Sequence, residues 1–92
     1  MQRRAGVVVR VRLFASLREA FGTSEIDVIL HENTFEYLIK ELNKAVRSKD
    51  QVLDVDRLLV AVNEEIISHS KLRELKFKSG DLIDLMPLPS GG

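Results

Sequence analysis

One segment of this chain has the periodic pattern of an amphipathic helix, and that pattern limits the choice of fold more than any other feature. Between residues 35 and 47, apolar side chains recur at helical spacing, and charged side chains occupy the other positions. Thr34 precedes the segment as a favourable N-cap, and Glu36 complements the helix dipole in the first turn. The apolar stripe comprises Phe35, Leu38, Ile39, Leu42 and Val46. Since a helix that is apolar on one side must pack against another layer, we expect the remaining residues to supply a sheet.

Alternation with a period of two residues predicts the strands of that sheet. In residues 7–15, side chains such as Val9 and Val11 would share one face, and Arg10 and Arg12 would point to the other. Further strand segments are predicted at residues 25–30, 58–62, 65–67 and 82–86. The first two strands would form an antiparallel hairpin, and Asn63-Glu64 would turn the third strand back into the fourth.

The connecting segments are polar or rich in turn-forming residues. Residues 16–21 predict a short helical turn that ends before Gly22, and residues 48–56 predict a polar loop. Residues 68–78 are expected to cross the surface irregularly, and Pro87 and Pro89 are expected to end regular strand pairing.

These elements predict a single α+β domain over residues 1–92. Its mixed sheet of four to five strands would pack on one main helix as a roll. Residues 1–6 would form an N-terminal extension, and residues 87–92 would form a flexible C-terminal tail.

Composition excludes several classes of function. Fourteen basic residues balance fourteen acidic ones, and the chain has no Trp and one Tyr, so nucleic acid is not an expected partner. Zero cysteines exclude disulfides and thiolate metal sites, and no apolar run reaches the length of a membrane span. His31 and His69 are far apart and lack carboxylates at ligand spacing, and no Gly-rich phosphate loop is present. We expect a cytoplasmic protein that binds no metal or nucleotide itself and has no membrane partner.

The most unusual feature is the end of the sequence, Pro87-Leu88-Pro89-Ser90-Gly91-Gly92. Glycine lacks a Cβ and accepts almost any backbone conformation, so Gly91-Gly92 could enter a narrow tunnel that excludes other residues. The two prolines would stiffen the approach. This segment is either an inert terminus or a finger whose terminal carboxylate is the reactive group.

Three segments resemble, in order, the small subunit of molybdopterin synthase. They are residues 12–19 (RLFASLRE) with Gly22-Thr23, residues 59–63 (LVAVN), and Ser79-Gly80-Asp81 followed by Pro87 and Gly91-Gly92. The resemblance implies the β-grasp, or ubiquitin-like, fold. That family often has two aromatic residues before the proline of the tail, where this chain has Leu85 and Met86.

The resemblance also implies a sulfur carrier whose reactive residue is Gly92, with Gly91 giving access to a partner's active site. An E1-like adenylating enzyme would use ATP to activate the Gly92 carboxylate, because a free carboxylate is a poor electrophile. A sulfur donor would then convert it into a thiocarboxylate. The large subunit of molybdopterin synthase would accept the charged tail and transfer the sulfur to a pterin precursor. The chain would be the non-catalytic, sulfur-donating subunit of that complex.

Docking requires a surface as well as a tail. We expect an apolar patch where the first and last strands meet, lined by Phe14, Leu17, Leu85, Met86 and Leu88. The simpler interpretation is that some of these side chains fill the core.

Three other functions stay open at this stage. The chain could be a ubiquitin-like modifier joined to lysines through Gly92, or a sulfur carrier for thiamine or tRNA thiolation. It could also be a passive interaction module with an inert tail.

Overall fold

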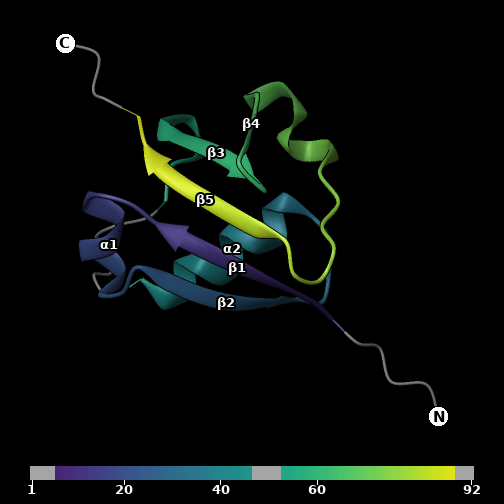
Figure 1. Ribbon diagram of the computed structural model, residues 1–92, viewed down its shortest axis with the longest axis horizontal. Coiled ribbons are helices and arrows are strands. Elements are labelled where there is room, and N and C mark those ends of the chain that lie inside the picture. The colour runs from purple at the N-terminus through teal and green to yellow at the C-terminus, as the bar shows by residue number, and fades with distance from the viewer. Residues whose placement is uncertain (1–5, 47–52, 89–92) are drawn as a thin grey trace.

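A five-stranded mixed sheet forms the framework of the protein, with strand order β2-β1-β5-β3-β4 (Figure 1). β1 (Val7–Leu13) pairs antiparallel with β2 (Glu25–Leu30) and parallel with β5 (Leu82–Pro87). β3 (Leu58–Val62) lies antiparallel to β5, and β4 (Glu65–Ile67) lies antiparallel to β3 at the sheet edge. The parallel pair brings the first strand beside the last, as the predicted mixed sheet requires.

The computed structural model describes residues 6–46 and 53–88. Within them, the main helix α2 (Phe35–Ala45) lies behind the sheet in Figure 1. Its predicted N-cap is confirmed, because Thr34 Oγ1 accepts a hydrogen bond of 3.1 Å from the Tyr37 backbone N–H. The shorter helices are α1 (Ser16–Phe21) and the 3₁₀ helices η1 (Val55–Arg57) and η2 (His69–Glu74).

The hydrophobic core lies between α2 and the inner face of the sheet. Strand alternation turns Val9 and Val11 inward, opposite Val28 and Ile83 on the neighbouring strands. The largest fully buried side chains are Leu13, Leu30, Leu38, Leu42, Ile83, Leu85, Val9, Val11 and Val60. Each of these contributes about 1.5–3 kcal/mol of hydrophobic free energy on burial. The predicted α+β roll is therefore confirmed, and the outer face of its sheet is not covered by any described element.

The first strand is two residues shorter than its pattern predicts. β1 ends at Leu13, and Ala15 has a φ of 55°, which takes the chain out of the extended conformation before α1. α1 then ends at Gly22, whose φ of 74° suits a residue without a Cβ. The predicted connection between β1 and β2 is thus a helical turn.

The β3–β4 connection is the tight turn that the sequence predicts. Asn63 and Glu64 have φ values of 51° and 73°, the sign that a two-residue hairpin turn of type I′ requires at both positions. The Asn63 side chain also donates to Asp81 Oδ1 and accepts from the Leu82 backbone N–H, each at 3.0 Å. The hairpin is therefore fixed to the start of β5.

β5 ends one residue later than predicted, at Pro87, and Pro89 lies outside the described residues. Pro87 lies opposite Leu58, and the next residue, Leu88, donates its N–H to Arg57 O at 2.9 Å. Since successive N–H groups of a strand point to opposite sides, the position of Pro87 would direct an N–H toward β1. β1 has already ended at Leu13, so the missing donor costs no ladder hydrogen bond.

The segment 68–78 is only partly irregular. Its first half forms η2, and the segment buries Leu72 and Phe77. Asn33 then holds the second half, because its side chain donates to Phe77 O at 2.9 Å and accepts from Phe77 N at 2.7 Å. The surface crossing predicted for this segment is thus a covering layer over one end of the core.

Candidate functional site

The tail residues Gly91 and Gly92 lie outside the described residues. The structure follows the chain to Leu88, where the Leu88 N–H bonded to Arg57 O fixes the last described residue beside η1. The functional site that the structure describes is therefore the surface from which the tail departs.

The predicted docking residues do not all lie on that surface. Phe14 and Leu88 are exposed at 38% and 37%, and Met86 is partly buried. Leu17 is partly buried and packs against the core, so it is not part of the patch. Leu85 is completely buried, opposite Leu13 in the core, so it offers no surface to a partner. Its inclusion in the patch was wrong because consecutive strand residues point to opposite faces, and only Met86 of this pair points outward.

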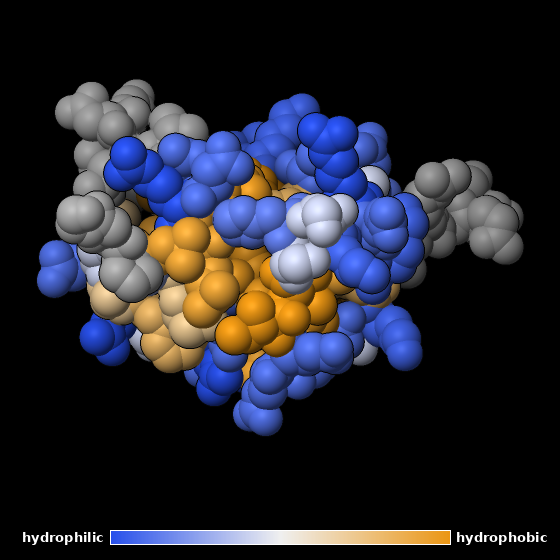
Figure 2. Space-filling view, turned by 90° about the horizontal axis from the view of Figure 1, so that it is seen from above, coloured by the Kyte–Doolittle hydropathy of each residue, from blue (hydrophilic) through white to orange (hydrophobic). Residues whose placement is uncertain are grey.

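Leu59 and Ile66 also belong to the outer face, on its β3–β4 side, and were missed, while Val8 and Ile29 are exposed on the β1–β2 side of the same face. Leu59 lies opposite Met86 in the register of β3 and β5, and Ile66 on β4 is 59% exposed. The alternating pattern of the strand could have identified Leu59, because Leu58 and Val60 point inward and the residue between them must point outward. We call Phe14, Leu59, Ile66, Met86 and Leu88 the outer patch. Figure 2 shows apolar surface gathered on the side of the molecule where β4 and η2 lie, surrounded by hydrophilic residues.

An ion pair lies at the centre of the outer face. Arg12 Nε and Nη2 donate to Asp84 Oδ1 and Oδ2 at 2.7 and 2.8 Å, and the guanidinium lies 5.8 Å from the centre of the Phe14 ring. The hydrogen bond to Asp84 raises the pKa of Arg12 above its ordinary value, against the opposing effect of desolvation. A second pair, Arg10 with Asp27 at 3.0 Å, is exposed toward the β2 edge.

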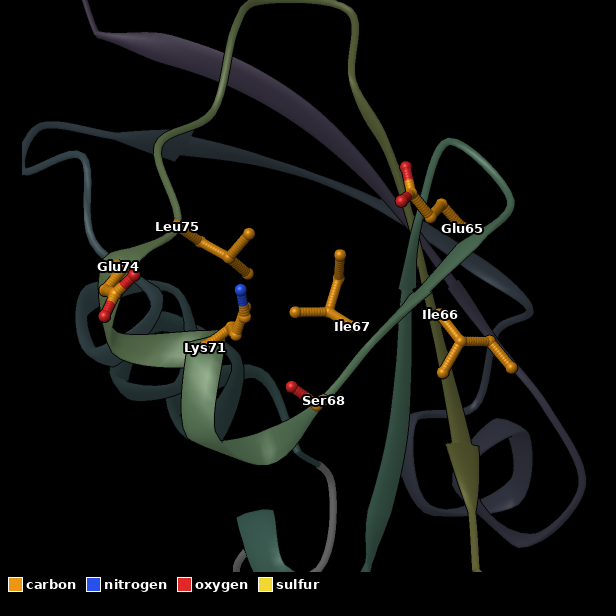
Figure 3. Close-up of a pocket in the computed structure, with 7 residues that line it drawn as sticks. All are labelled: Glu65, Ile66, Ile67, Ser68, Lys71, Glu74 and Leu75. Atoms are coloured by element: carbon orange, nitrogen blue, oxygen red, sulfur yellow. The ribbon is translucent and has the colours of Figure 1, made fainter.

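A shallow groove of about 480 Å³ separates β4 from η2 (Figure 3). Ile67, Lys71 and Leu75 point toward one another across it, whereas Ile66 points away to the outer face. The groove is lined by Glu65, Ile66, Ile67, Ser68, Lys71, Glu74 and Leu75. It contains no histidine, and the Ser68 hydroxyl on its lining lies 3.3 Å from the Ser70 hydroxyl, with which it shares a hydrogen bond.

Within residues 6–46 and 53–88, no group of three or more His, Asp and Glu side chains is placed to hold a metal ion. His69 is used structurally, since its Nε2 donates to Leu58 O at 2.8 Å, and the His31 ring packs edge-on against Tyr37. None of the described helices is long and apolar enough to cross a membrane.

The sequence from residue 11 to residue 92 matches the ThiS family. This chain belongs to the ThiS family. The match begins within β1, includes both Arg12 and Asp84, and continues through Gly91-Gly92. No curated protein matches the chain.

Solved structures of similar fold come from several organisms. The small archaeal modifier protein 1 of Methanosarcina acetivorans is 28% identical, with a TM-score of 0.69 over 95% of this chain and 98% of that one. A putative molybdopterin converting factor subunit 1 of Pyrococcus furiosus is 26% identical, with a TM-score of 0.69 over 90% and 99%.

A third similar structure is a complex. A chain of the complex of subunits 1 and 2 of the molybdopterin-converting factor from Helicobacter pylori is 21% identical, with a TM-score of 0.60 over 94% and 100%. Together, these findings confirm the predicted β-grasp fold and the resemblance to ubiquitin-like sulfur carriers.

Proposed function

We propose that this chain is a sulfur carrier that serves as the small subunit of a molybdopterin synthase in the cytoplasm, with Gly92 as its reactive residue. The observation that carries the proposal is the ThiS-family match, which runs through the final Gly91-Gly92 of a β-grasp domain. The 26% identity to the putative molybdopterin converting factor subunit 1 of Pyrococcus furiosus supports the choice of this pathway for the proposal.

The reaction takes place at the Gly92 carboxyl group and uses groups supplied by partners. An E1-like enzyme joins a carboxylate oxygen to the α-phosphorus of ATP, and pyrophosphate leaves. A sulfur nucleophile at the oxidation level of sulfide then attacks the acyl carbon, and AMP leaves with the electron pair of the C–O bond. The product is a thiocarboxylate, the form in which the carrier would present sulfur to the pterin precursor.

The outer patch gives this carrier a docking surface beside its tail. Leu88 belongs to the patch and immediately precedes residues 89–92, so a partner that covers the patch also lies next to the reactive end. Exposed apolar side chains at the centre of an interface contribute most of the binding free energy. The large subunit and the activating enzyme are the partners that we propose for this surface.

The docking role of the outer patch is tested by Met86→Asp. A carboxylate at this position would have to be desolvated in an apolar interface, so we expect the Kd for the large subunit to rise at least about tenfold. Ile29→Asp, on an exposed residue at the β2 edge, is the matched control and should change the Kd by less than about twofold. Calorimetric titration measures both variants, and an unchanged Kd for Met86→Asp would remove this residue from the interface.

The pathway is tested by reconstitution. Thiocarboxylated chain, large subunit and cyclic pterin precursor should yield molybdopterin, detected by mass spectrometry. A chain extended by one residue after Gly92 should yield none. Sulfur transfer to a thiamine or tRNA precursor, with none to the pterin, would contradict the proposed pathway. The proposed role of the chain as a sulfur carrier would still stand.

A second candidate function is protein modification. The 28% identity to the small archaeal modifier protein 1 of Methanosarcina acetivorans favours it. In that case, cells should contain high-mass conjugates of the chain that disappear when Gly92 is followed by an extra residue. Immunoblots of cells expressing each form distinguish the two functions.

A further inference from the structure

The outer patch is apolar around a polar centre. Arg12 and Asp84 lie opposite each other on β1 and β5, with Ala61 opposite Asp84 on the other side. Phe14 lies against the Arg12 guanidinium. On the other side, Ala61 of β3 pairs with Ile66 of β4. A partner that covers the apolar side chains must therefore also cover this ion pair.

The two members of the pair differ in what they offer to a partner. Both Asp84 carboxylate oxygens accept from Arg12, and the Asp84 side chain is only 9% exposed. Arg12 is 34% exposed and uses Nε and Nη2 for this contact. An arginine has five N–H donors, and two of those of Arg12 bond to Asp84. The remaining three, two on Nη1 and one on Nη2, have no acceptor among the described residues.

When a partner covers the outer patch, these free N–H donors lose their water and lower the binding affinity unless the partner supplies an acceptor. A donor that loses water without gaining an acceptor carries a desolvation penalty, and the penalty is larger for a charged group. Asp84 fixes the guanidinium in one orientation, so its free N–H groups point to a defined position on the partner. The Arg12 guanidinium is therefore a hydrogen-bond donor held in a fixed position within an apolar surface.

The charges nearby restrict the acceptor. Glu25 lies opposite Arg12 on β2, where its carboxylate is 3.9 Å from Arg10, and both Glu25 and Glu64 act electrostatically on Arg12 in addition to Asp84. A partner carboxylate at this position would meet these three acids, whereas a neutral carbonyl oxygen would meet no such repulsion. Basic residues at the rim of the partner's surface would be attracted to Glu25 and Glu64.

We propose that Arg12, oriented by Asp84, is a specificity-determining residue that donates to a neutral carbonyl oxygen at the centre of an apolar, basic-rimmed surface on the large subunit. The inference rests on the proposed function, since it names the chemistry of the partner that covers the outer patch. It assigns a role in recognition to a pair that would otherwise only join two strands.

The test removes the pair as a unit. Arg12→Met alone would leave Asp84 as an unpaired buried carboxylate, but Arg12→Met/Asp84→Val replaces both groups by apolar side chains, which commonly preserves folding. We expect the thermal midpoint of this double variant to stay the same or rise. We expect its Kd for the large subunit, measured by calorimetry, to rise at least about tenfold, because the partner's acceptor loses its donor.

A matched control lies on the same face of the sheet. Arg10→Met/Asp27→Val removes an ion pair outside the outer patch, and its Kd should stay within about twofold of the parent value. The exchanged variant Arg12→Asp/Asp84→Arg keeps an ion pair but moves the donor from β1 to β5, by about 4.8 Å. It should also bind at least about tenfold more weakly, which keeps the test decisive if the apolar variant does not fold.

An unchanged or lower Kd for Arg12→Met/Asp84→Val would overturn the inference and leave the proposed function intact. If the parent chain itself does not bind the large subunit, the proposed function fails, and the inference fails with it. The two failures are thus distinguished by the parent titration.

Discussion

At the scale of single residues, neighbouring Leu85 and Met86 show how strongly a strand separates core from surface. Leu85 lies opposite Val60 in the core, and Met86 lies opposite Leu59 on the outer face. The composition of the segment could not separate them, because both side chains are apolar and of similar size. The register decides, since side chains of opposite parity point to opposite faces.

This separation predicts different energetic effects for two similar substitutions. Leu85→Ala should lower the free energy of unfolding by about 2–5 kcal/mol, because it opens a cavity in a fully packed core. Met86→Ala, the matched control, should cost less than about 1.5 kcal/mol and should act mainly on partner binding. Urea unfolding measures both variants, and equal losses of stability would contradict the assigned orientation of β5.

At the scale of elements, helix α2 and the strands could be predicted from periodicity, but the covering segment after η2 could not. Helix and strand patterns repeat within a few residues, so they can be read locally. The covering segment is held instead by Asn33, which is 44 positions away from Phe77 in the sequence. Nothing in the local sequence of either segment indicates that partnership.

The Asn33 contact predicts a stability effect that arises outside the helices and strands themselves. Asn33→Ala removes both hydrogen bonds to the Phe77 backbone and leaves its part-buried N–H and C=O groups without their partner, so we expect a loss of about 1–3 kcal/mol. Asn33→Asp keeps the acceptor for the Phe77 N–H and should lose less. Hydrogen exchange at the Phe77 amide should accelerate in Asn33→Ala, and an unchanged exchange rate would contradict the role given to this side chain.

At the scale of the whole molecule, the sheet separates stability from function. Its inner face and α2 hold the core, so the outer face is free to carry the outer patch and the Arg12–Asp84 pair. The order of elements predicted this layered fold, and the family match confirms it. Patterning could not predict the ion pair as a unit, because Arg12 and Asp84 meet only when the first and last strands pair in parallel.

The central claim is that Gly92 carries sulfur, and the absence of cysteine makes a direct measurement possible. The chain is incubated with its activating enzyme, ATP and a sulfur donor, then treated with a thiol alkylator, and the adduct is mapped by mass spectrometry. We predict an ATP-dependent adduct on the C-terminal peptide at Gly92 that is absent when one residue is added after Gly92. If the enzyme forms the Gly92 adenylate but no adduct follows in the presence of the donor, the sulfur-carrier account is contradicted.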